Sequence, residues 1–193
     1  GDGPLDIAIS GTYAYLIDDD ANNLYVVNIS DPTNSVLLDS LGIGNTPTAI
    51  ANSGNYLYVT DETDNDLKVI DISDTENPTL VDTLILGGRP ERIAISGNYA
   101  YVVDKGSKDL KVIDISSPTE ISLTGSLGIG SSPEDITVDG NFAYITDQSS
   151  DDLKVVDVSD PTNPILINDI AVGGLPIRVL KSGNFAYVAE FLD

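Results

Sequence analysis

The stretch GNYAYVVD at residues 97–104 decides the fold, because the chain of 193 residues contains it and four close copies of it. Each copy begins 43 residues after the one before, without an insertion or a deletion. The copies are GTYAYLID at 11–18, GNYLYVTD at 54–61, GNFAYITD at 140–147 and GNFAYVAE at 183–190. A fixed period of this length indicates a repeat architecture.

Two further series keep the same step of 43 residues. One is an apolar run containing a lysine in three of its four copies: LYVVNIS at 24–30, LKVIDIS at 67–73 and 110–116, and LKVVDVS at 153–159. The other is a ladder of prolines: Pro4, Pro47, Pro90, Pro133 and Pro176. The whole chain is therefore one array of equivalent units.

Each unit contains short β-rich runs separated by Gly, Pro, Asn and Asp, and none has a helical period. In the fourth unit we expect strands at 134–139, 141–147, 153–159 and 165–171. Four strands in about 43 residues are typical of a β-propeller blade, whereas a parallel β-helix has shorter turns. We predict an all-β propeller of four-stranded antiparallel blades at 1–43, 44–86, 87–129 and 130–172, with a partial blade at 173–193.

Turn residues support these hairpins. Ser96, Gly97 and Asn98 suit a tight turn between the first two strands, and the segment 159–164 places two prolines between the last two. The loops joining the second strand to the third, and one blade to the next, then lie together on the other face of the disc. We also expect Tyr58, Tyr101 and Tyr144 to be buried between blades.

The two ends of the chain are duplicates, since residues 173–193 repeat the register of residues 1–21. Neither end can complete the other, so the second strand of the partial blade keeps a free edge near 185–189. Free edges invite pairing. We expect the native chain to continue into further blades, with a strand from a neighbouring subunit as the alternative.

The units YAYVVD followed by LKVIDISSP, and FAYITD followed by LKVVDVSDPTNP, closely resemble the LVIVD repeat found in bacterial and archaeal surface and secreted proteins. The resemblance extends over essentially the whole chain. It implies a β-propeller and an extracellular or cell-surface location. The family has no defined activity and no catalytic residues to transfer.

Composition excludes several functions. The chain has no Cys, His, Met or Trp, which rules out disulfides, thiolate or imidazole metal sites and catalysis by His or Cys. With 31 acidic and 9 basic residues its net charge is −22, so we expect no nucleic-acid partner. No apolar run reaches the roughly 20 residues of a membrane span, so we expect no direct membrane insertion in this segment.

Acidic residues gather in the loop between the second and third strands. Such oxygen clusters bind Ca²⁺ in some proteins, although the spacing of an EF-hand loop is absent here and the third unit has Lys105, Gly106, Ser107 and Lys108 instead. A solvated acidic rim is the simpler interpretation. The calcium candidates are Asp61, Asp64, Asp66, Asp147, Asp151 and Asp152.

A second set of candidates breaks the repeat near the expected channel strand: Arg89, Glu91, Arg92 and Arg178. Arginines around a glutamate can clamp an anion, and a local network of ion pairs is the simpler interpretation.

We therefore expect a non-enzymatic scaffold or adhesion module that contacts other proteins or itself, in a surface filament or layer. No cofactor is required by this function. One alternative is a carbohydrate-binding or carboxylate-dependent glycoside-active propeller, which acids of raised pKa in the channel would favour. The other is a calcium-dependent adhesin.

Overall fold

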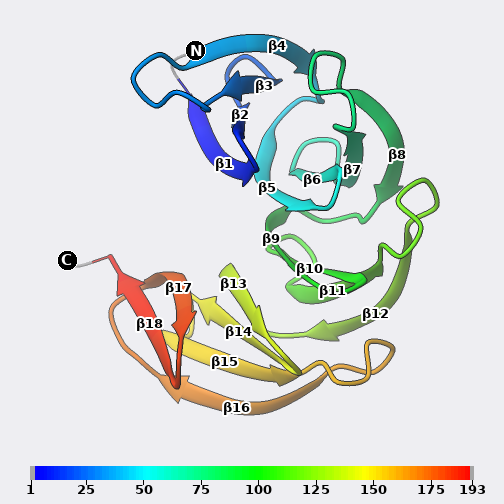
Figure 1. Ribbon diagram of the computed structural model, residues 1–193. Coiled ribbons are helices and arrows are strands. Elements are labelled where there is room, and N and C mark those ends of the chain that lie inside the picture. The colour runs from blue at the N-terminus through cyan, green and yellow to red at the C-terminus, as the bar shows by residue number, and fades with distance from the viewer. Residues whose placement is uncertain (1–2, 192–193) are drawn as a thin grey trace.

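The computed structural model of the protein describes residues 3–191, which form eighteen strands (Figure 1). The strands make four four-stranded sheets and one two-stranded sheet, all antiparallel and each in sequence order. The prediction of four blades and a partial fifth is confirmed. Within these residues no helix has the length and apolar character needed to cross a membrane.

The blades have closely matching strand bounds. Blade 1 contains β1 (Pro4–Ser10), β2 (Tyr13–Asp18), β3 (Asn23–Asn28) and β4 (Val36–Gly42). Blade 2 contains β5 (Pro47–Ser53), β6 (Tyr56–Asp61), β7 (Asp66–Asp71) and β8 (Thr79–Ile85). Blade 3 contains β9 (Pro90–Ser96), β10 (Tyr99–Asp104), β11 (Asp109–Asp114) and β12 (Ser122–Gly128). Blade 4 contains β13 (Pro133–Asp139), β14 (Phe142–Asp147), β15 (Asp152–Asp157) and β16 (Ile165–Ala171). Blade 5 contains β17 (Pro176–Ser182) and β18 (Phe185–Glu190).

The blades are arranged in an open arc. The first strands of successive blades contact one another along the inner side, and the fourth strands lie on the outside (Figure 1). The arc is open on the side where both termini lie, at the left of Figure 1. The described strands therefore do not form a closed ring, as expected from the duplicated ends.

Local chemistry sets the hairpins. Gly97 has a φ of 58° at the first central position of the two-residue turn between β9 and β10, a position that favours glycine. The third strand of blade 4 ends at Asp157, two residues earlier than predicted. It ends there because the Asp157 carboxylate accepts the N–H of Ser159 at 2.9 Å and turns the chain.

The core lies between blades, because each blade buries one face against the next blade and the other against the previous one. Tyr15 and Ile17 of blade 1 pack with Leu57 and Val59 of blade 2. The third strands contribute to both faces: in β11, Val112 joins the cluster with blade 4 while Ile113 joins the cluster with blade 2. Folding therefore depends on stacking neighbours.

The tyrosines at the third position of each second strand face the next blade. Tyr58 is 1% exposed and Tyr101 is 3% exposed, as predicted. Tyr144 is only half-buried. Tyr101 packs beside Val158, which directly follows the third strand of blade 4, and the two-stranded blade 5 has no such strand to cover Tyr144.

We expect Tyr58→Ala to lower the free energy of unfolding by about 3 kcal/mol, because it opens a cavity between two blades. The matched control is Tyr187→Ala, three repeats further on, where the side chain is 58% exposed and the loss is within about 0.5 kcal/mol. Urea unfolding of both variants measures the difference. Equal losses would show that the burial of Tyr58 does not stabilise the stack.

Candidate functional site

The most regular polar feature is a carboxylate at the last residue of every second strand, which we call the repeated carboxylate. In the three central blades it is completely inaccessible to solvent. Its members are Asp18, Asp61, Asp104, Asp147 and Glu190. A buried charge is stable only when it is paired and hydrogen-bonded.

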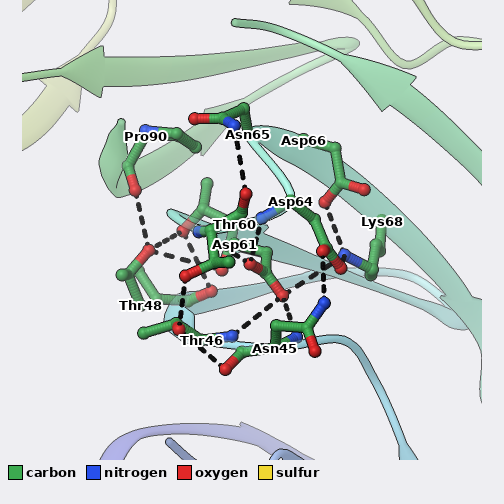
Figure 2. Close-up of polar contacts among 12 residues, drawn as sticks. Asn45, Thr46, Thr48, Thr60, Asp61, Asp64, Asn65, Asp66, Lys68 and Pro90 are labelled. Atoms are coloured by element: carbon green, nitrogen blue, oxygen red, sulfur yellow. Dashed lines mark hydrogen bonds and ion pairs between the residues drawn. The ribbon is translucent and has the colours of Figure 1, made fainter. Parts of the chain in front are cut away.

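Asp61 shows how this condition is met (Figure 2). Its Oδ2 accepts the backbone N–H groups of Asn45 at 2.8 Å and Thr46 at 3.2 Å, in the connection from blade 1. Its Oδ1 accepts those of Thr63 at 3.0 Å and Asp64 at 2.8 Å, in the loop between β6 and β7. One carboxylate thus holds two loops together, which confirms that these loops share a face of the disc.

The same bonds recur in the next two blades. The Asp104 carboxylate accepts from Arg89 N at 2.7 Å and Ser107 N at 2.9 Å, and the Asp147 carboxylate accepts from Ser131 N at 3.0 Å, Ser132 N at 3.1 Å and Ser149 N at 3.1 Å. The connection must also pass very close to the carboxylate. At Gly44, where φ is 129°, a Cβ atom would collide with the Asp61 carboxylate. Glycine is therefore needed there.

Lys68 is the counter-ion of an acidic cluster formed by Asp61, Asp64 and Asp66, and its own side chain is buried, with 6% of the residue exposed (Figure 2). Its Nζ lies 2.6 Å from Asp66, 3.0 Å from Asp64 and 3.4 Å from Asp61. Burial lowers the pKa of Lys68, but the hydrogen bonds that Lys68 donates to Asp66 and Asp64 outweigh this effect, so the pKa is raised above its ordinary value. Lys68 is therefore charged at neutral pH.

Lysines occupy the same place in the next two blades. Lys111 lies 2.6 Å from Asp109 and 3.5 Å from Asp104, and Lys154 lies 3.0 Å from Asp169 and 3.1 Å from Asp152. We did not predict these internal pairs from the sequence. The sequence does contain a signal for these pairs, because a lysine recurs at the same position of an otherwise apolar strand in three repeats. Blade 1 differs, since it has Tyr25 at that position.

These contacts bear on the calcium candidates. The structure brings Asp61, Asp64 and Asp66 together, with an oxygen from each lying within 4.8 Å of the others. The Lys68 ammonium group already occupies the middle of that set. It supplies the positive charge that a metal ion would bring.

The candidates of blade 4 do not converge in the same way. Asp147 bonds to backbone N–H groups and Asp152 pairs with Lys154. The Asp151 carboxylate instead accepts the N–H of Leu175 at 3.1 Å, in the connection to blade 5.

The second set of candidates does not form one clamp. Arg89 extends to Glu62 of blade 2, at 2.8 Å. Glu91 lies 3.7 Å from Lys105, which also pairs with Glu134 at 2.7 Å.

Arg92 and Arg178 lie on a different row, at the sixth position of their repeats, and flank Asp135. Burial raises the pKa of Asp135, while the N–H of Val179 and the charges of Arg178 and Arg92 oppose the increase. The Asp135 carboxylate accepts that N–H at 2.9 Å. Opposite charges therefore alternate along the inner strands of blades 3, 4 and 5, a pattern that the sequence analysis missed.

The fold and these contacts define a repeat protein of β-propeller type. The chain matches the LVIVD repeat at residues 5–41, 46–84, 87–128, 130–172 and 174–192. It belongs to the LVIVD repeat family. A search of curated proteins gives no significant match.

Solved structures agree with this fold. A functionally unknown protein from Desulfotomaculum acetoxidans is similar with a TM-score of 0.84 and 17% identity, over 97% of this chain and 62% of the other. The periplasmic gluconolactonase of Pseudomonas aeruginosa is similar with a TM-score of 0.81 and 15% identity, over 97% and 63%. Hydrazine synthase of Kuenenia stuttgartiensis is similar with a TM-score of 0.73 and 20% identity, over 93% of this chain and 51% of the other. The chain thus spans less than two thirds of these proteins, and such low identities show the fold alone.

We expect Asp61→Ala to lower the free energy of unfolding by about 3–5 kcal/mol, because it breaks a buried ion pair and leaves four backbone N–H groups without their acceptor. The control is Asp71→Ala in the same blade, where an exposed carboxylate accepts only the N–H of Ser73 and the loss is about 1 kcal/mol. Chemical denaturation measures both. A loss at Asp61 no larger than at Asp71 would contradict a structural role for the repeated carboxylate.

Proposed function

We propose that this chain is a non-enzymatic scaffold that presents a rigid repeated surface for contact with other proteins or with further copies of itself. One observation carries the proposal: the charged groups that a sequence suggests as site residues are used to hold the blades together. The repeated carboxylate bonds to loops, and the buried lysines pair with aspartates. Regular display is the property that such an array offers.

The proposed location is extracellular or at the cell surface. Two features support this location. The LVIVD repeat is found in surface and secreted proteins of bacteria and archaea, and the net charge of −22 disfavours nucleic-acid partners. The chain contains no cysteine and therefore no disulfides. Internal ion pairs and packing between the blades stabilise it instead.

Asp135 is the observation that favours the second candidate, a carbohydrate-active propeller. Its pKa is raised by burial and it lies on an inner strand, which is where a catalytic acid is expected. However, Asp135 accepts the N–H of Val179 and has two arginines as neighbours. These partners give it a structural task. We therefore keep the scaffold as the principal proposal.

The test uses beads coated with the purified chain, with albumin-coated beads as the control. We expect the coated beads to clump, because many copies on one surface add their weak contacts together. Clumping should be equal in Ca²⁺ and in chelator, since Lys68 occupies the acidic cluster. Dispersed beads would contradict contact between copies of the chain, and clumping only in Ca²⁺ would instead support a calcium-dependent adhesin.

An enzymatic assay on the same preparation tests the second candidate. We expect no hydrolysis of gluconolactone or of aryl glycosides above the buffer rate. Turnover that disappears in Asp135→Asn would establish the carbohydrate-active alternative and displace the scaffold proposal.

A further inference from the structure

A hollow of about 350 Å³ lies where blades 3 and 4 meet, and we call it the first hollow. Tyr99 and Tyr101 of β10 border it, together with Asn98 in the turn before β10 and Asn141 in the turn before β14. Tyr99 begins β10 and the repeated carboxylate Asp104 ends it. The first hollow therefore lies on the face of the disc opposite to the repeated carboxylate.

The same feature recurs between blades 1 and 2, as a second hollow of about 400 Å³. Its border contains Tyr13, Tyr15 and Asn55, which stand two repeats before the two tyrosines and the second asparagine of the first hollow. Thr12 takes the place of Asn98. Each hollow is formed by a junction of two neighbouring blades inside the array, so the repeat itself produces it.

The hollows are neutral in a strongly acidic chain. None of the described residues that border either hollow is charged, although the chain contains 31 acidic residues. Aspartates lie just outside, because Asp74 directly precedes Thr75 of the second hollow and Asp160 directly precedes Pro161 of the first. This negative surround repels anions, and no carboxylate lines the hollows to hold a cation. The ligand that fits is uncharged.

The fold does not use the polar side-chain groups of the first hollow. Tyr101 is 3% exposed, and no group within residues 3–191 hydrogen-bonds to its hydroxyl. Asn98 and Asn141 accept the N–H groups of Ile115 and Val158 at 2.8 Å through their backbone carbonyls. Their exposed side-chain amides have no partner in the described part of the chain. A buried hydroxyl without a protein partner and two free amides thus border one hollow.

Turn geometry does not explain the asparagines either. The positive φ of the turn before β10 belongs to Gly97, and Asn98 is not among the described residues with positive φ. In blade 1 Thr12 occupies the same position and the turn still forms. The amides are therefore available to a ligand.

A neutral sugar matches this set of groups. Its hydroxyls both donate and accept hydrogen bonds, as side-chain amides and tyrosine hydroxyls do. The apolar faces of its ring pack against aromatic side chains, which combine an apolar body with a polar tip. Both volumes are near the lower end of the range of about 300–1,000 Å³ for small-molecule sites. Each hollow thus has room for a sugar ring.

We propose that these hollows bind the sugar units of a neutral polysaccharide. Tyr101 and Asn141 contact the sugar in the first hollow, and the equivalent Tyr15 and Asn55 do so in the second. Each site alone is weak, but a polymer that reaches both on one rigid face adds their affinities together. The inference goes beyond the proposed function, because the ligand is not a protein and the sites do not depend on contact between copies.

Native gel electrophoresis in gels that contain a dissolved polysaccharide tests the proposal. The neutral probes are dextran, mannan, galactan and hydroxyethyl cellulose, and the acidic comparison is alginate. We expect at least one neutral polymer to slow the migration of the chain but not that of albumin, and alginate to leave it unchanged. Migration that none of the four neutral polymers slows would overturn the proposal. Slowing by alginate would contradict an uncharged ligand.

Tyr101→Phe separates binding from structure. It removes only a hydroxyl that has no protein partner within residues 3–191, so urea unfolding should show unchanged stability. Binding to the polymer that slows the chain should weaken about two- to tenfold, as expected for one lost hydrogen bond. Asn141→Ala should weaken binding similarly, and Asn55→Ala combined with Asn141→Ala should weaken it further. Full binding in Tyr101→Phe and in the double variant would overturn the placement of the sites.

Asn163→Ala is the matched control. Asn163 is an exposed asparagine in the loop after β15, on the same face of the disc, and it borders neither hollow. Its variant should migrate like the unchanged chain in every gel, and circular dichroism should show that all variants fold. A loss of binding in Asn163→Ala as large as that in Asn141→Ala would show that the polymer binds elsewhere on this face, and would overturn the proposed sites.

Discussion

The buried carboxylate at the end of each second strand is the constraint on which the rest of the architecture depends. Asp61, Asp104 and Asp147 each accept backbone N–H groups from two loops, one inside the blade and one arriving from the previous blade. Hydrogen bonds to a charged acceptor contribute about 1.5–3 kcal/mol each. They fix where each blade begins relative to the last, and so make an apolar stack into a regular arc.

The constraint also explains the neighbouring residues. The connection must approach the carboxylate closely, which requires glycine at Gly44. The buried negative charge must be balanced, and Lys68 balances it from within the third strand. The same acidic loop that suggests a metal site is therefore an internal ion-pair cluster.

The sequence predicted the architecture well, because periodicity reports directly on repeated packing. The four blades with a partial fifth, the tight turn at Gly97 and the shared face of two loops all followed from spacing and turn chemistry. The partners of the charged groups did not follow. Asp61 ends the second strand of blade 2 and Asp160 lies in a loop of blade 4. The first is buried and the second is exposed, and only the path of the connecting chain decides which. The partial exposure of Tyr144 likewise depends on a neighbouring blade rather than on local sequence.

Hydrogen exchange at the connecting loops tests the central claim most directly. The amides of Asn45, Arg89 and Ser131 lie outside strands but donate to the repeated carboxylate. We predict that they exchange as slowly as strand amides, and that Asp61→Asn speeds exchange at Asn45 while Arg89 and Ser131 stay protected. Fast exchange at all three amides in the unchanged chain would contradict the account, because the loops would then be held by something other than these carboxylates.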